Sequence, residues 1–99
     1  MNRVVNVRKD FSDIYVGRKY QFHPGSPWQN PFHIRGFGPD ERLRVIREYI
    51  AYFYAPEQKW LREKAIAEIP SNAILGCWCA PSLCHAEIIA GYLEWKRIQ

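Results

Sequence analysis

One segment near the C-terminus constrains the fold of this 99-residue chain more than any other. Residues 73–79 (Ala-Ile-Leu-Gly-Cys-Trp-Cys) are almost entirely apolar and predict a buried β-strand. Ala80 and Pro81 end this strand, and Ser82 is a suitable N-cap for a C-terminal helix. The apolar stripe of that helix consists of Ile88, Ile89, Tyr92, Leu93 and Trp95. A buried strand that leads directly into a helix indicates a small mixed domain, α/β or α+β.

The rest of the chain predicts two short strands, a long loop and two more helices. Residues 4–8 and 14–16 are β-branched or aromatic runs on either side of turn residues, and we expect them to pair as an N-terminal β-hairpin. Residues 17–38 are rich in glycine, proline and aromatic residues without a helical or strand period, which indicates a long loop. Pro39 is typical of a first helical position, and a second helix is expected over residues 57–69. The first helix has its apolar stripe at Leu43, Ile46, Ile50 and Phe53.

The composition is that of one domain spanning residues 1–99. Hydrophobic residues make up 47% of the chain, which excludes a disordered tail. No apolar run is long enough for a transmembrane helix and the N-terminus lacks the apolar segment of a signal peptide, so we expect no membrane partner. The three cysteines are an odd number and do not suggest a secreted disulfide framework, so a reducing, cytoplasmic compartment is expected.

The net charge of +4 is concentrated in the N-terminal third of the chain. Residues 1–35 carry six basic and two acidic side chains, whereas residues 36–99 carry eight of each. This excess favours a polyanion or a phosphate group as partner, although a solvated basic face would have the same composition. The loop also combines cations such as Arg18 with aromatic rings such as Trp28. That combination suits a nucleobase with its phosphate, or single-stranded nucleic acid.

All three cysteines and one of the three histidines lie within residues 77–85. Thiolates and imidazoles bind soft metals, so the first interpretation is a sulfur-rich zinc site. Its ligands would be Cys77, Cys79, Cys84 and His85. The spacing differs from that of standard zinc motifs, whose paired ligands are separated by about two to four residues. His23 or His33 could therefore replace His85 as the fourth ligand.

Two other interpretations of the same segment remain open. In a catalytic or anion-binding pocket, Cys84 and His85 would be the second and third residues of the last helix, where free amides and the helix dipole favour a thiolate beside a neutral imidazole. Cys84 would then be the nucleophile and the most reactive thiol, with His85 as its base. In the third interpretation, Cys77 and Cys79 are small hydrophobic core residues. The sequence leaves undecided whether the protein is an enzyme.

Several segments, taken in order, resemble one known family, the domain of unknown function 4326. They are residues 4–8 (Val-Val-Asn-Val-Arg), 15–18 (Tyr-Val-Gly-Arg), 30–32 (Asn-Pro-Phe), 76–81 (Gly-Cys-Trp-Cys-Ala-Pro) and the pair Cys84-His85. The resemblance covers nearly the whole chain. It implies a short protein of a bacterium, an archaeon or a phage, and hence a bacterial cytoplasm or a phage-infected host. It also implies that the matching segments act together, but it implies no particular activity.

The leading hypothesis is one pocket for an anionic ligand, either a nucleotide or a nucleic-acid component. The loop 17–38 and the strand-to-helix turn 76–85 would form this pocket, with Cys84 and His85 as its catalytic candidates. The ligand-binding residues would be Arg8, Gly17, Arg18, Asn30 and Trp78. The alternative is a non-enzymatic interaction module stabilised by zinc. The sequence does not indicate the oligomeric state.

Overall fold

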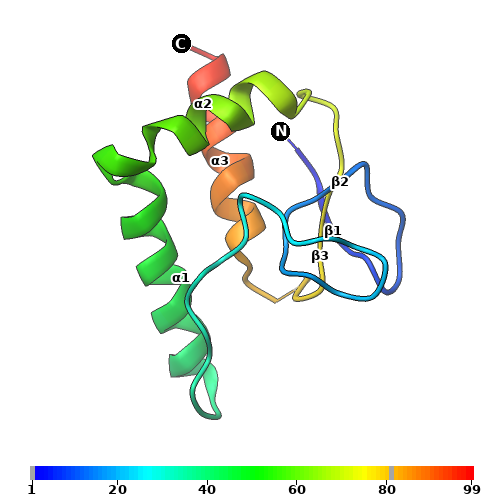
Figure 1. The fold of residues 1–99 in the computed structure, drawn as a ribbon, viewed down its shortest axis with the longest axis vertical. Coiled ribbons are helices and arrows are strands. Elements are labelled where there is room, and N and C mark those ends of the chain that lie inside the picture. The colour runs from blue at the N-terminus through cyan, green and yellow to red at the C-terminus, as the bar shows by residue number, and fades with distance from the viewer. Residues whose placement is uncertain (1, 81) are drawn as a thin grey trace.

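A computed structural model describes residues 2–80 and 82–99 of the chain (Figure 1). Their elements are β1 (Val4–Asn6), β2 (Ile14–Tyr15), α1 (Pro39–Tyr54), the 3₁₀ turn η1 (Pro56–Gln58), α2 (Lys59–Glu68), β3 (Leu75–Cys77) and α3 (His85–Arg97). The expected mixture of helices and strands is confirmed. None of the described helices is both long and apolar enough to cross a membrane.

The sheet has the strand order β1-β3-β2, and both outer strands run parallel to β3. Leu75 pairs with Val4 of β1 on one side and with Ile14 of β2 on the other. The predicted N-terminal hairpin is therefore wrong, because the central strand separates β1 from β2. Every residue of β3 is buried, and such an apolar strand is stable where it is covered on both edges and both faces.

The connection between β1 and β2 crosses the central strand at Gly76. A Cβ atom at this position would lie 2.5 Å from Cγ1 of Val7 and would also collide with the side chain of Ser12. Glycine therefore allows the connection to lie directly against β3. At its end, the carboxylate of Asp13 accepts the backbone N–H of Ile74 at 2.7 Å. The turn residues that suggested a hairpin thus carry the chain to the opposite edge of the sheet.

Helix α3 begins later than the sequence predicted. Its N-cap is Cys84, in an extended conformation (φ −138°, ψ 150°), in place of Ser82. Ser82 instead donates its backbone N–H to the carbonyl of Cys79 at 3.0 Å, which holds it in the preceding turn. Cys84 and His85 are consequently the N-cap and the first residue of the helix, not its second and third residues. Pro81, which was expected to end the strand, lies outside the described residues.

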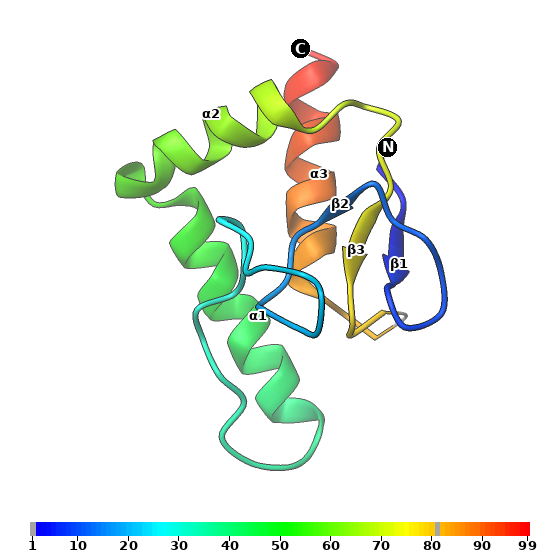
Figure 2. The same ribbon diagram turned by 45° about the vertical axis from the view of Figure 1, so that its right-hand side comes forward.

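Helix α3 lies between the sheet and the other two helices (Figure 1 and Figure 2). Both faces of α3 contribute to the core. The largest fully buried side chains of the core are Tyr49, Phe53, Leu61, Ile69, Leu75, Ile89 and Leu93. On α1 the buried face differs from the predicted stripe, since Leu43 and Ile50 are 39% and 40% exposed. Val45 is buried instead, whereas Ile46, Phe53 and the neighbouring Tyr49 are buried as expected.

The predicted long loop is confirmed between β2 and α1, where the described residues form neither helix nor named strand. It passes over α1 and is anchored in the core by Trp28 (Figure 2). The indole N–H of Trp28 donates to the carbonyl of Leu61 at 3.1 Å, and its own carbonyl accepts the hydroxyl of Tyr49 at 2.8 Å. The anchor keeps the second half of the loop beside the start of α1.

Candidate functional site

A cavity of about 480 Å³ opens where the three parallel strands end. Its walls are the segments that follow β1, β2 and β3, together with loop residues 30–34 and one face of α1. Open α/β sheets place their ligand sites at this edge. Every residue singled out in the sequence as catalytic, ligand-binding or metal-binding lines the cavity: Arg8, Gly17, Arg18, Asn30, Cys77, Trp78, Cys79, Cys84 and His85. The roles of these residues remain predictions.

The two other histidines considered as metal ligands lie in different places. His33 lines the cavity and is exposed. His23 is absent from the cavity wall, and its ring stacks on that of Tyr15 with 4.5 Å between the centroids. His23 therefore does not join the cysteine segment.

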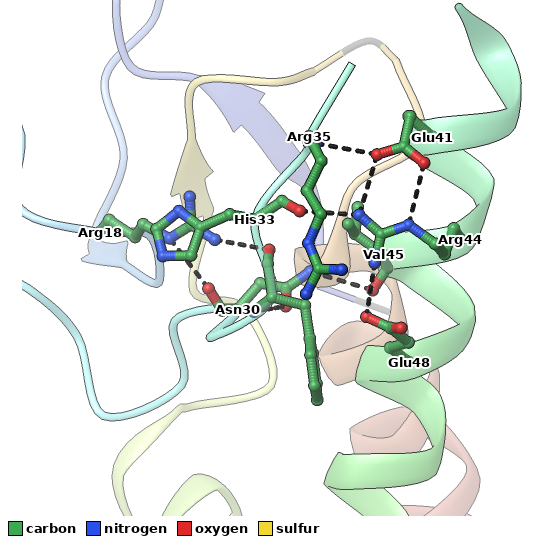
Figure 3. A network of polar contacts seen from close by, with 9 residues as sticks. Arg18, Asn30, His33, Arg35, Glu41, Arg44, Val45 and Glu48 are labelled. Atoms are coloured by element: carbon green, nitrogen blue, oxygen red, sulfur yellow. Dashed lines mark hydrogen bonds and ion pairs between the residues drawn. The ribbon is translucent and has the colours of Figure 1, made fainter. Parts of the chain in front are cut away.

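The guanidinium of Arg18 is held by backbone carbonyls of the loop (Figure 3). Its Nε donates to Asn30 O at 2.9 Å and its Nη2 to Phe32 O at 2.6 Å. The chain that carries Arg18 is fixed as well, because the hydroxyl of Tyr15 donates to its carbonyl. A Cβ on Gly17 would lie 2.6 Å from that hydroxyl oxygen, so glycine is what permits this contact.

Asn30 ties the loop to helix α1. Its side-chain amide donates to the carbonyl of Val45 at 3.2 Å, and its side-chain oxygen accepts the N–H of Phe32 at 2.9 Å (Figure 3). Asn30 is 8% exposed, so both contacts are shielded from water. Its first effect is therefore structural: it presents to Arg18 the carbonyls that orient the guanidinium.

Arg8 and Trp78 form a second wall. The guanidinium carbon of Arg8 lies 5.6 Å from the centroid of the Trp78 ring, and the ring of Tyr20 stacks on Trp78 at 5.6 Å with an interplanar angle of 9°. The buried side chain of Asn6 supports this wall by accepting the N–H of Arg8 at 2.9 Å. Its amide also donates to the carbonyl of Ala80 at 2.9 Å. Trp78 itself is 44% exposed, so part of its ring is accessible.

Arg42, on the first turns of α1, is a cavity residue that the sequence analysis missed. Its Nη1 donates to the carbonyl of Leu83 at 3.3 Å, and Cys79 lines the same cavity. The available signal was its helical phase, because Arg42 precedes the cavity residues Val45 and Ile46 by three and four positions. An arginine on the otherwise apolar face of a helix indicates a cation directed toward a partly buried site.

The cavity wall contains three arginines and no aspartate or glutamate. Within residues 2–80 and 82–99, the ion pairs involve Arg44, Lys59 and Lys64 as cations. Arg8, Arg18 and Arg42 thus have no carboxylate partner in that part of the chain. Backbone carbonyls orient a guanidinium without neutralising its charge, so the cavity carries a concentrated positive charge.

The three thiols are close neighbours but differ in exposure and in pKa. Cys77 and Cys84 are each 1% exposed, whereas Cys79 is half-buried. The neighbouring thiols of Cys77 and Cys84, together with the guanidinium of Arg42, lower the pKa of Cys79. The neighbouring sulfurs of Cys77 and Cys79, together with burial, raise the pKa of Cys84. Cys79 is the most exposed of the three thiols, so accessibility favours it over Cys84, and the order of reactivity stays a prediction.

His85 is held as a neutral imidazole in the core. Its Nε2 lies 2.7 Å from the carbonyl of Val16, and since a carbonyl can only accept, Nε2 carries the proton. The other nitrogen, Nδ1, is left as an acceptor 3.5 Å from the sulfur of Cys84. Burial lowers the pKa of His85, against the opposing effect of the Val16 hydrogen bond. The Val16 carbonyl is the orienting group for His85 that the sequence could not name.

A metal site is not formed in the described part of the chain. Among residues 2–80 and 82–99, no three His, Cys, Asp or Glu side chains are arranged so that they could hold a metal ion. All three cysteines are free thiols. Zinc binding by Cys77, Cys79, Cys84 and His85 therefore stays a prediction.

The segments that build this cavity match a known family over almost the whole chain. Residues 2–95 fit the family model described as "Domain of unknown function (DUF4326)". The chain belongs to the DUF4326 family. The resemblance seen in the sequence is thereby confirmed.

The DUF4326 chain also has a viral relative. It is 34% identical over 71 residues to "Uncharacterized protein R718" of Acanthamoeba polyphaga mimivirus. The aligned part covers 68% of this chain and 49% of the viral protein, so the chain spans about half the length of this curated relative. No solved structure matches the chain. An origin in a bacterium or a phage stays a prediction for this DUF4326 protein.

Proposed function

We propose that this DUF4326 domain binds an anionic ligand, a nucleotide or a nucleic-acid component, in the cavity at the strand ends. One observation carries the proposal: Arg8, Arg18 and Arg42 face a common cavity that no carboxylate lines. Guanidinium groups are suited to phosphate because their planar N–H groups can donate in pairs. An anion would add acceptors and negative charge to those of the backbone carbonyls and of the Cys79 sulfur.

The size and the aromatic wall of the cavity favour a nucleotide over a simple inorganic ion. Small-molecule pockets enclose roughly 300–1,000 Å³, and this cavity has a volume of about 480 Å³. Tyr20 stacks on the ring of Trp78 and Arg8 lies over it, so this 44% exposed ring offers a base an aromatic contact at its open part. The start of α3 adds positive potential near Cys84, since the first amides of a helix have no partner within it.

The direct test is calorimetric titration of the protein with mononucleotides, the matching nucleosides and pyrophosphate. We expect nucleotides to bind more tightly than nucleosides. Arg42→Gln should weaken nucleotide binding by at least about tenfold, which corresponds to about 1.4 kcal/mol. Arg47→Gln, on the exposed side of the same helix, is the matched control and should bind as the wild type does. Equal affinity of the two variants, or no binding by any nucleotide, would overturn the proposal.

A salt titration distinguishes a mononucleotide from a nucleic-acid strand. Binding of a single-stranded oligonucleotide should weaken linearly with salt on logarithmic axes, with a slope of about −0.7 per phosphate contacted. An oligonucleotide that fails to bind even at low salt would leave only the mononucleotide form of the proposal. The proposed setting is a reducing cytoplasm, in which the three free thiols would persist.

The zinc-stabilised interaction module is the second candidate, and the mutual contacts of the three thiols favour it. Elemental analysis of protein purified without added metal tests it. One zinc per chain, together with unfolding when a chelator is added, would support this candidate. A metal-free protein that keeps its fold would exclude it, and would leave the anion-binding proposal unaffected.

A further inference from the structure

Anion binding leaves the sulfur chemistry of the cavity unused. Three thiols meet at the end of β3, and they line the same cavity as the three arginines. Only Cys79 is partly exposed, and Cys77 and Cys84 lie against it, buried. A partly exposed thiol beside a cation, with further thiols in contact, is the arrangement found where thiols attack disulfides.

We infer that Cys79 exchanges thiol and disulfide with a small anionic disulfide, such as a peptide disulfide that carries free carboxylates, and that Cys84 resolves the adduct. The cation-lined, acid-free cavity selects for negative charge on this substrate. Arg42 donates to the carbonyl of Leu83, the residue before Cys84, and lines the same cavity as Cys79, so its charge lies near the two reacting cysteines. The inference uses the cavity but does not depend on nucleotide binding.

The exchange has two steps, and no further oxidant is required. First, the Cys79 thiolate attacks one sulfur of the substrate, the substrate S–S bond breaks, and one thiolate leaves. Second, the sulfur of Cys84 attacks that of Cys79, the mixed disulfide breaks, and the second substrate thiolate leaves. The proton of Cys84 passes to that thiolate, with Nδ1 of His85, 3.5 Å from the Cys84 sulfur, placed to receive it on the way. The protein loses two electrons to form a Cys79–Cys84 disulfide, and the substrate is reduced to two thiols.

The turn between the two cysteines makes their pairing possible. The carbonyl of Cys79 accepts the N–H of Ser82 at 3.0 Å, which turns the chain back toward the strand end. The amide of Asn6 holds the same turn through the carbonyl of Ala80. Cys79 and Cys84 line the same cavity in the reduced protein. Cys77, on the strand itself, is the neighbour that we do not expect to resolve the adduct.

The test uses reduced wild-type protein, freed of metal by chelator and gel filtration, with oxidised glutathione as the anionic disulfide. Mass spectrometry of intact and digested protein should show the first adduct on Cys79, followed by loss of glutathione and formation of the Cys79–Cys84 disulfide. Cys84→Ser should stop at the mixed disulfide, whereas Cys77→Ser should still go on to the Cys79–Cys84 disulfide, at a rate changed by the loss of the thiol beside Cys79. A first adduct on Cys77 or Cys84 in the wild type would overturn the inference, and this readout needs no variant to fold.

Charge selection is measured with cystamine, a small disulfide that carries two amines instead of carboxylates. The wild type should react with oxidised glutathione at least about tenfold faster than with cystamine, after each rate is divided by that of a denatured sample. Arg42→Gln should reduce this ratio and Arg47→Gln should retain it. Equal rates for the two disulfides in wild-type protein would refute anionic selection. Calorimetry with nucleotides on Cys79→Ser reports on the first proposal separately, so the two can fail independently.

Discussion

Two arginine-containing regions of this small domain lie side by side and use the same side chain differently (Figure 3). On α1, Arg44 pairs with Glu41 at 2.9 Å and with Glu48 at 3.0 Å. In the cavity, Arg18 donates to two backbone carbonyls and has no carboxylate partner within the described residues. The first arginine is neutralised by its neighbours, whereas the second is oriented but remains uncompensated.

The electrostatic consequences differ accordingly. The hydrogen bonds of Arg44, with the backbone N–H of Arg35, lower the pKa of Glu41 to about 2, and the pKa of Arg44 is raised in turn. Arg44 also donates to the carbonyl of His33, so its network holds the end of the loop against α1. The comparison teaches that a compensated arginine serves to position the loop, while an uncompensated one is available to a ligand.

The largest effect on stability is expected from removing the side chain of Asn30, which connects the cavity loop to helix α1. Asn30→Ala leaves the N–H of Phe32 without its acceptor and frees the carbonyls that orient Arg18, so we expect a loss of about 1–3 kcal/mol in the free energy of unfolding. Urea denaturation measures this loss. Asn72→Ala, in an exposed turn, is the control and should change stability by less than about 0.5 kcal/mol. A similar small change for Asn30→Ala would show that Trp28 and the Arg44 network hold the loop without the contacts of Asn30.

A second test asks whether His85 adds a positive charge to those of the cavity arginines. Because burial lowers the pKa of His85, the unfolded chain takes up a proton more readily than the folded one below the ordinary value of about 6.5. Stability should therefore be retained above that pH and fall as the pH drops below it, by up to about 1.4 kcal/mol per unit. His85→Gln should flatten this part of the profile in urea denaturation between pH 7.5 and 5. Parallel profiles would mean that folding leaves the pKa of His85 unchanged.

An intermediate effect on stability is expected from Arg18 in the cavity. Arg18→Gln removes two hydrogen bonds from a half-buried guanidinium, and we expect about 1 kcal/mol of lost stability. Nucleotide affinity should fall by at least about tenfold in calorimetry. A variant that loses stability but keeps its full affinity would show that Arg18, like Arg44, is a structural residue.

The smallest effect on stability is expected from Arg44, the arginine that is paired with carboxylates. Arg44→Gln breaks exposed ion pairs, which contribute little to stability because water and salt screen them. We expect a slightly lower Tm in thermal unfolding and an unchanged nucleotide affinity. An affinity as low as that of Arg42→Gln would contradict the distinction between compensated and uncompensated arginines.

The local elements were predictable because their signals lie within a few residues. Pro39 does occupy the start of α1, and the apolar run around Leu75 does form a buried strand. The hairpin was not predictable, since the choice of β3 as the partner of both outer strands depends on contacts about sixty to seventy positions apart in sequence. The late start of α3 was missed for a similar reason: Ser82 is a good N-cap locally, but a backbone bond to Cys79 holds it in a turn.

The sequence by itself pointed to the residues that line the cavity, because the Cys/His segment, the composition of the loop and the family resemblance are all visible in local sequence. Gly17, Asn30 and Cys77 were named in this way before any contact was known. Only the tertiary structure decided the state of those groups. The orientation of Arg18 by two carbonyls, the proton on Nε2 of His85 and the position of Arg42 beside Cys79 all require neighbours from distant segments. Charge compensation and burial are sums over such neighbours, and local sequence does not contain them.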